Sequence, residues 1–284
     1  MESLSKIKEK FKNDGYCVLF NFFSQKKLGK IKKKIYDVIK DEKNYLPIKN
    51  IAAYSKNSRL LKGPNGKLKK NLKKFDIQKG LGNIAKKSNS ISIRDPLINI
   101  MELNDIVFDN KLIKVASTIL DSPKIKLGYI KLGVFFDNKL PKNCINFFHT
   151  DDLSKKVSKQ NKACKFSFTL SSSSMTKNEF GILPIKKNKL KFYRQYFKTD
   201  FLSSDLQKKI IYPTLNLGDT VLFDPNNFFH VANKPKNNLR IIFYIEFFVS
   251  KNKFLSSNVK IKKKIFQNLN ENKKKLCSHY QIIN

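Results

Sequence analysis

A histidine and an aspartate lie two positions apart in the apolar segment NFFHTDD, residues 146–152. The chain has only three histidines, so a histidine next to a carboxylate needs an explanation. Side chains alternate between the two faces of a β-strand, so His149 and Asp151 point to one side while Thr150 and Asp152 point to the other. This spacing predicts two neighbouring ligands of a metal ion. The alternative is a polar residue at a strand end followed by a turn.

A second histidine and one of the few arginines, further along the chain, could belong to the same site. His230 lies at the end of a β-like run in the segment DPNNFFHVANKPKNNLR, residues 224–240. Ten residues later, Arg240 begins the strand-like run RIIFYIEFF. Arg240, Tyr244 and Glu246 share one face of that run.

Two histidines and one carboxylate form the facial triad that holds Fe(II) in non-haem oxygenases. Such a triad leaves three coordination positions of the metal open for a bidentate co-substrate and O₂. An anionic co-substrate needs a fixed cation, and arginine supplies a bidentate one. Each residue also has an ordinary structural explanation: His230 could cap a loop, and Arg240 could pair with Glu246 or another carboxylate. Their combination favours a metal centre.

The charge of the chain is strongly positive, with 58 lysine and arginine residues, 22 acidic residues and a formal net charge of +36. Such a charge is typical of proteins that bind nucleic acids or membrane surfaces. Those proteins rely on arginine for two-pronged contacts to phosphates and bases. This chain has four arginines: Arg59, Arg94, Arg194 and Arg240. We therefore expect the lysines to cover a solvated surface, and we do not expect nucleic acid binding.

Cysteine usage and hydropathy favour a soluble cytoplasmic protein. The cysteines Cys17, Cys144, Cys164 and Cys277 are far apart and form no CxxC pair. We expect reduced thiols rather than disulfides or a zinc knuckle. The N-terminal segment lacks an apolar signal region, and no apolar run approaches the ~18 residues that a membrane span requires.

Helices are predicted in the first part of the chain. A short basic helix over 5–14 precedes a strand-like run over 16–23. Ser24 is a good N-cap for a helix that extends to about residue 42. Another helix is expected over about 106–120, and the stretch 62–71, which contains glycine and proline, is predicted to be a loop.

From about residue 125, short apolar runs alternate with polar turns, a pattern typical of a β-sandwich or barrel. The expected strands are 126–136, 143–151, 164–172, 181–185, 220–225 and 239–249. We predict a mainly β fold with helical flanks, organised as one domain over residues 1–284. Its parts are a helical N-terminal part at about 1–124, a β core at about 125–250 and a basic helical tail at about 251–284.

Several segments resemble the phytanoyl-CoA dioxygenase family of Fe(II)/2-oxoglutarate-dependent oxygenases, across most of residues 7–250. FKNDGYCVLFNFFSQKKLGKI resembles the opening strand and helix of the family, and FHTD resembles its first two iron ligands. KNEFGILPI resembles the segment that leads to a PGSH turn. LNLGDTVLFDPNNFFHVANKPKNNLR resembles the block with the distal histidine and the arginine, and it is the most specific of these segments.

This resemblance implies a double-stranded β-helix (jelly-roll, cupin-like) core. It implies that His149, Asp151 and His230 bind Fe(II), and that Arg240 binds the distal carboxylate of 2-oxoglutarate. O₂ would be the other co-substrate.

Two positions depart from the family pattern. PIKKNK stands where PGSH is usual, so that turn is expected to be built differently. Ala232 stands where a hydroxyl often helps to hold 2-oxoglutarate, which implies weaker co-substrate binding or a different hydroxyl donor, such as Thr220 or Thr169. The same departures raise the alternative of an oxygenase that has lost its activity.

The resemblance implies a hydroxylase that acts on a small, anionic metabolite and releases succinate and CO₂. Asp151 favours hydroxylation, because halogenating members of the superfamily lack this carboxylate. Candidate substrate contacts, chosen by position alone, are Arg94, Tyr129, Lys131 and Tyr244.

A hypothesis from a different class is a non-catalytic β-helix module that binds an anionic partner through its lysine-rich surface. Such a module would bind nucleic acid with a steep dependence on salt and would hold no iron.

Overall fold

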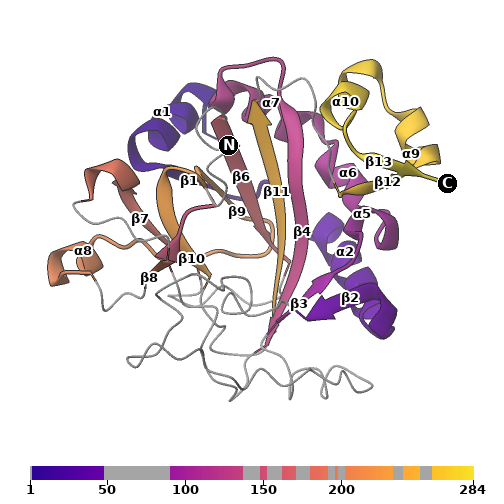
Figure 1. The fold of residues 1–284 in the computed structure, drawn as a ribbon, viewed down its shortest axis with the longest axis horizontal. Coiled ribbons are helices and arrows are strands. Elements are labelled where there is room, and N and C mark those ends of the chain that lie inside the picture. The colour runs from indigo at the N-terminus through magenta and orange to yellow at the C-terminus, as the bar shows by residue number, and fades with distance from the viewer. Residues whose placement is uncertain are drawn as a thin grey trace.

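Two antiparallel sheets form the core of the protein in a computed structural model (Figure 1). The model describes residues 2–47, 90–136, 148–151, 162–170, 180–190, 196–197, 202–232, 239–249 and 258–284. The larger sheet has the strand order β1-β9-β6-β11-β4-β3-β2, and the smaller has the order β7-β10-β5-β8. The predicted mainly β fold with helical flanks and a double-stranded β-helix core is confirmed.

The strands have the following bounds. The larger sheet contains β1 Tyr16–Leu19, β2 Tyr45–Pro47, β3 Ser90–Ile93, β4 Lys126–Phe136, β6 Lys162–Thr169, β9 Thr220–Phe223 and β11 Leu239–Val249. The smaller sheet contains β5 Phe148–His149, β7 Phe180–Lys186, β8 Tyr196–Phe197 and β10 Phe228–Ala232. A separate parallel pair near the C-terminus consists of β12 Lys260–Lys262 and β13 Gln281–Ile283.

The helices flank the larger sheet or cap the ends of the sheets (Figure 1). They are α1 Leu4–Asp14, α2 Gln25–Val38, α5 Pro96–Asn99, α6 Leu103–Val107, α7 Asn110–Leu120, α8 Ser204–Lys208, α9 Lys263–Asn268 and α10 Glu271–Leu276. Two 3₁₀ turns, η1 Glu42–Asn44 and η4 Lys187–Lys189, complete the set. The C-terminal tail, which we expected to be helical, thus also contributes the β12–β13 pair.

Local capping explains where two of the predicted helices begin and end. The expected N-cap Ser24 is confirmed, because its hydroxyl accepts a hydrogen bond from the Lys27 amide at 3.3 Å. The helix expected over 106–120 is two helices. Asp109 has an extended backbone and its carboxylate accepts hydrogen bonds from the amides of Lys111 and Leu112, so it ends α6 and starts α7.

One expected strand is shorter in the structure, and one expected loop is not among the described residues. The strand expected over 16–23 ends at Leu19, because Asn21 turns with a φ of 47° and its amide donates to the Asp219 carboxylate at 2.8 Å. The loop expected over 62–71 lies outside the described residues. In the part of the chain that the structure describes, no helix has the length and apolar character to cross a membrane.

The two faces of the larger sheet differ in chemistry. One face packs on helices, with α7 against β6 and β11. It carries the apolar residues Leu132, Val134, Phe166, Phe168, Ile241, Phe243, Ile245 and Phe247. The opposite face looks into the β-helix towards the smaller sheet. By the alternation of the strands and their register, it carries Tyr129, Lys131, Lys165, Ser167, Thr169, Arg240, Tyr244 and Glu246.

This second set of residues, which we call the inner face, is rich in polar and charged side chains that a packed β core does not need. Buried charges cost stability unless they are paired or serve a site. The polar and charged side chains of the inner face therefore indicate a functional site in the interior of the β-helix.

One glycine ties α1 to the smaller sheet. Gly15 is the C-cap of α1 and has a φ of 78°, and a Cβ at this position would lie 2.4 Å from the ring of Phe228. We expect Gly15→Ala to destabilise the protein by about 2–5 kcal/mol, because left-handed strain and overpacking add up. The shift of the urea unfolding midpoint measures this effect.

Gly29 provides the matched control for that substitution. It is an exposed residue within α2, and a Cβ there would meet no heavy atom within 4 Å. We expect Gly29→Ala to raise the free energy of unfolding by up to about 1 kcal/mol, because alanine favours the helix. Equal stability of the two variants would contradict the assigned role of Gly15.

Candidate metal centre

Strand pairing in the smaller sheet brings three metal-binding side chains together. β5 and β10 are antiparallel neighbours, and His149 lies directly opposite His230. Their imidazole centroids are 4.5 Å apart. Asp151 follows β5, and its amide donates a hydrogen bond to the Pro225 carbonyl at 2.7 Å, which ties the residue to the turn before β10. One ligand atom from each of the three residues lies within 4.8 Å of the others.

The distances within this cluster suit a shared ion. The Oδ1 atom of Asp151 is 3.6 Å from Nε2 of His149 and 3.5 Å from Nε2 of His230. Thr150, between the first two residues, is fully buried. The same oxygen thus faces both imidazoles, so that a single cation can be bound by all three groups.

The imidazole of His230 is held in one orientation. Its Nδ1 atom lies 3.4 Å from the carbonyl oxygen of Phe228, and the ring packs near Phe223 at 4.8 Å between centroids. A histidine that donates from Nδ1 to a carbonyl keeps the lone pair of Nε2 for a metal. His230 is only 6% exposed, so this donor is also shielded from water. Two imidazoles and one carboxylate are a donor set that fits Fe(II).

Sequence reasoning missed one member of the cluster. Lys165, in β6, is 6% exposed, and its ammonium group donates to Oδ2 of Asp151. It also lies over the ring of Tyr129 at 5.2 Å and near the rings of Phe223 and Tyr244 at 6.0 Å each. The one sequence signal was a lysine inside the mainly apolar run ACKFSF, and that signal is weak in so lysine-rich a chain.

The charges in the cluster shift one another's titration. Burial opposes the charge of Asp151, but Lys165 and the two histidines hold the pKa of this carboxyl well below its usual value. Burial likewise opposes the charge of Lys165, but the Asp151 and Glu246 carboxylates raise its pKa. Burial and the repulsion from Lys165 lower the pKa of Lys131 to about 8. Because the pKa of Asp151 is lowered and that of Lys165 is raised, both groups are charged at neutral pH and the ion pair between them is fully formed.

Arg240 lies on the inner face and is almost completely buried, at 1% exposure. Its guanidinium carbon stacks 4.6 Å from the centre of the Phe135 ring. The sequence left open an ion pair with Glu246, which is six residues further along β11. That pair is excluded, because six residues of strand span about 20 Å.

The two candidate hydroxyl donors lie on opposite faces of the larger sheet. Thr169 is on the inner face, buried opposite Ile242 of β11. Thr220 pairs with Phe168, whose ring belongs to the helix-side core, and its hydroxyl donates to the Ser167 carbonyl at 2.9 Å. By this register Thr220 belongs to the helix side of the sheet, and its hydroxyl is already bonded to a backbone carbonyl, so it is the less suitable of the two candidates. Thr169 keeps the suitable position.

Three of the four candidate substrate contacts share the inner face. Tyr129 and Lys131 lie in β4, and Tyr244 lies opposite Lys131 in β11. Arg94 does not join them. Its side chain is exposed just after β3, two strands away from β11, and its Nε atom donates to the Tyr45 carbonyl at 3.4 Å.

The departures from the family pattern fall in well-defined structure. The PIKKNK segment forms the end of β7 and the turn η4, and the Lys187 amide donates to the Asn227 carbonyl at 2.8 Å. The turn that precedes β10 is thus hydrogen-bonded to η4. Ala232 ends β10, opposite Phe180.

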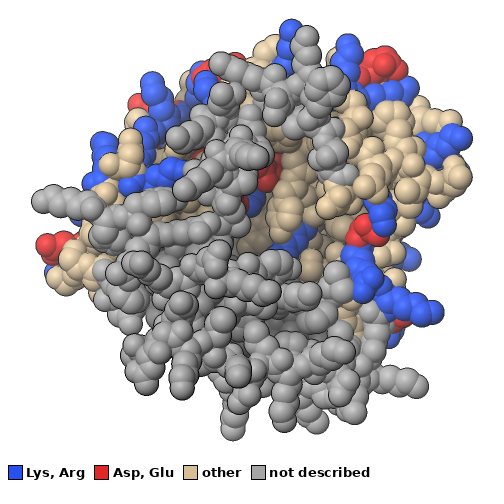
Figure 2. Space-filling model, in the orientation of Figure 1, with Lys and Arg blue, Asp and Glu red and all other residues tan. Residues whose placement is uncertain are grey.

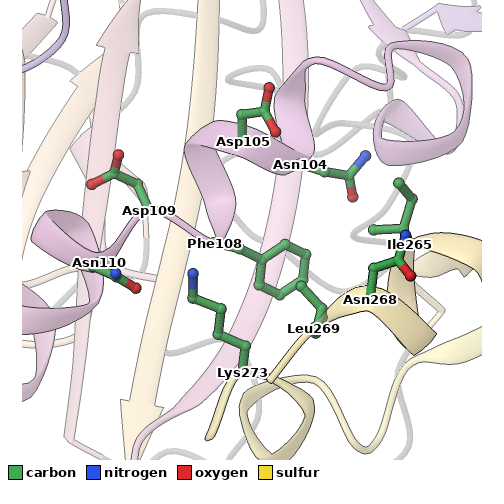
Figure 3. A pocket seen from close by; sticks show the side chains of 9 residues that line it. All are labelled: Asn104, Asp105, Phe108, Asp109, Asn110, Ile265, Asn268, Leu269 and Lys273. Atoms are coloured by element: carbon green, nitrogen blue, oxygen red, sulfur yellow. The ribbon is translucent and has the colours of Figure 1, made fainter. Parts of the chain in front are cut away.

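A separate cavity of about 410 Å³ lies between the α6–α7 region and the C-terminal helices (Figure 3). It is lined by Asn104, Asp105, Phe108, Asp109, Asn110, Ile265, Asn268, Leu269 and Lys273. Much of its polar lining has a structural task. Asp109 caps α7, and the Asn104 amide donates to the carbonyls of Leu97 and Met101.

Comparison with known proteins gives structural relatives only. No family model matches the sequence. No curated protein matches it either.

Solved structures with the same fold are numerous. HygX from Streptomyces hygroscopicus, solved with nickel and 2-oxoglutarate bound, is 10% identical with a TM-score of 0.58, covering 90% of each chain. EvdO2 from Micromonospora carbonacea var. aurantiaca, complexed with 2-oxoglutarate, is 13% identical with a TM-score of 0.57, covering 86% of this chain and 90% of the other.

A third relative is the epimerase SnoN in complex with Fe³⁺, α-ketoglutarate and nogalamycin RO. It is 10% identical with a TM-score of 0.56, covering 86% of this chain and 82% of the other. The chain thus shares its double-stranded β-helix fold with these 2-oxoglutarate-binding proteins.

Proposed function

We propose that this protein is an Fe(II)/2-oxoglutarate-dependent dioxygenase of the phytanoyl-CoA dioxygenase type, which hydroxylates a small anionic metabolite and releases succinate and CO₂. The observation that carries the proposal is the cluster of His149, Asp151 and His230, whose ligand atoms lie within 4.8 Å of one another. It lies inside a fold shared with proteins solved with iron or nickel and 2-oxoglutarate.

Each residue of the cluster has a defined task in this proposal. His149, Asp151 and His230 hold Fe(II), which together with 2-oxoglutarate supplies the O₂-dependent oxidative chemistry. The Phe228 carbonyl fixes the imidazole of His230, with Nε2 facing Asp151. The rings of Phe180 and Phe223 flank this imidazole and exclude water from it.

Arg240 is the proposed anchor for the distal carboxylate of 2-oxoglutarate. A buried guanidinium on the inner face offers two parallel donors, and the Phe135 ring holds its plane. Thr169 is the proposed hydroxyl partner, since it is buried in β6 opposite Ile242, two residues along β11 from Arg240.

The proposed substrate contacts are Tyr129, Lys131 and Tyr244 on the inner face. Lys131 gives this surface a positive charge that favours an anionic substrate. Relatives with this fold include an epimerase and a carbocyclase, so the fold alone does not select the reaction. Asp151 retains the complete set of ligands, which favours hydroxylation.

Anaerobic calorimetry with Fe(II) tests the metal centre without any knowledge of the substrate. We expect one Fe(II) per chain, and we expect 2-oxoglutarate to bind the Fe(II)-loaded protein much more tightly than the metal-free protein. Absence of metal binding would overturn the proposal. Absence of metal binding, combined with nucleic acid binding that weakens steeply with salt concentration, would favour the lysine-rich binding module instead.

On the face seen in Figure 2, lysine and arginine side chains are scattered along the rim, with acidic residues among them.

A further inference from the structure

Lys165 places a buried ammonium group on the carboxylate that faces both histidines. Asp151 uses Oδ1 towards Nε2 of His149 and His230 and uses Oδ2 to accept from Lys165. The side chain of Lys165 is 8% exposed and that of Asp151 is 25% exposed. The two oxygens of one carboxylate are thus assigned to different partners.

This arrangement is costly for the fold and does not serve its packing. A buried lysine loses its hydration and stabilises a protein only when it is well paired. The neighbours of Lys165 across the sheet are Phe223 on β9 and Glu246 on β11. An apolar residue would pack well between Phe223 and the ring of Tyr129. The ammonium group of Lys165 therefore indicates a functional role at the candidate metal centre.

The charges suggest what that task is. The groups in direct contact are two neutral imidazoles, the Asp151 carboxylate and the Lys165 ammonium, and their charges sum to zero. The Glu246 carboxylate lies opposite Lys165 on β11 and is the same in every variant. A divalent cation therefore brings the cluster to a charge of about +2, instead of +1 for the same ligands without the lysine. The ammonium and the cation share one carboxylate and repel each other, which weakens metal binding. A dianion that joins the metal relieves this repulsion.

Building on the proposed function, we propose that Lys165 is a positioning residue that confines Asp151 to metal binding through one oxygen and couples metal binding to binding of a dianion. Without a dianion the site holds a divalent cation weakly. With 2-oxoglutarate present, the charges of the metal, Lys165, Asp151 and the co-substrate sum to zero, and metal and co-substrate strengthen each other's binding by the same factor.

The test measures binding rather than turnover. The dissociation constant for Co(II) is determined by calorimetry, with and without saturating 2-oxoglutarate, in the wild type, Lys165→Met and Lys165→Arg. We expect Lys165→Met to bind Co(II) alone at least about tenfold more tightly, and the strengthening by 2-oxoglutarate to fall at least about tenfold. Lys165→Arg keeps the charge and should keep most of the coupling. Lys162→Met, an exposed position in the same strand, is the control and should behave like the wild type.

The outcomes separate this inference from the proposed function. If the wild type binds Co(II) and 2-oxoglutarate but Lys165→Met shows the same coupling, Lys165 has no role in the coupling. That result overturns the inference on Lys165 and leaves the proposed function standing. Weaker Co(II) binding in a folded Lys165→Met protein also overturns it, because loss of repulsion must strengthen binding. Lys165→Gln replaces Lys165→Met if the latter fails to fold. A wild type that binds neither metal nor 2-oxoglutarate overturns both proposals.

Discussion

Replacing His230 by alanine is expected to weaken Fe(II) binding by more than about a hundredfold, because even the outer-shell partners of a metal site are worth ten- to a hundredfold in affinity. His230 supplies one of the three candidate ligand atoms. Anaerobic calorimetry measures the loss, and circular dichroism checks that the variant is folded.

The chain supplies its own control for this substitution. His279 is the histidine that the cluster does not use, and it lies in the C-terminal tail against Phe248 and Tyr280. We expect His279→Ala to bind Fe(II) as the wild type does. Equal Fe(II) binding by His230→Ala and His279→Ala would show that His230 is not a ligand.

Replacing Arg240 by lysine should weaken binding of 2-oxoglutarate to the Fe(II)-loaded protein about ten- to a hundredfold. The substitution keeps the charge but loses the planar fork, and one charge-assisted hydrogen bond is worth roughly 1.5–3 kcal/mol. The stacking on Phe135 weakens as well, since it depends on the guanidinium plane. Fe(II) affinity in the absence of 2-oxoglutarate should barely change, because Arg240 is not among the ligands.

Arg94→Lys is the matched control. It changes the same residue type at an exposed position whose Nε atom bonds a backbone carbonyl. We expect Arg94→Lys to leave 2-oxoglutarate affinity unaltered. If Arg240→Lys behaves in the same way, Arg240 has a structural role and the co-substrate site lies elsewhere.

The part of the site that local rules govern was predictable from sequence. Side-chain alternation predicted that His149 and Asp151 point to the same side, and their ligand atoms do lie together, although β5 ends at His149 and the bond to the Pro225 carbonyl helps to place Asp151. The scarcity of arginine singled out Arg240, and its position on the inner face follows from the alternation of β11.

What escaped prediction depends on pairing between distant strands. Lys165 contacts Asp151 across the two sheets, and no spacing in the sequence reports that contact. The face on which Thr220 lies is set by its register with Phe168 on β6. The break between α6 and α7 was missed for another reason. The apolar pattern continued through it, while the capping carboxylate of Asp109 decided the boundary.

Formation of succinate from 2-oxoglutarate tests the central proposal most directly. The assay follows succinate under air with Fe(II) in the wild type, His149→Ala, His230→Ala and His279→Ala. We expect succinate that requires both Fe(II) and O₂ in the wild type and in His279→Ala, and none above the protein-free background in the other two. Succinate formation by His149→Ala and His230→Ala at the wild-type level, or none by a wild type that binds Fe(II) and 2-oxoglutarate, would contradict a 2-oxoglutarate-dependent dioxygenase.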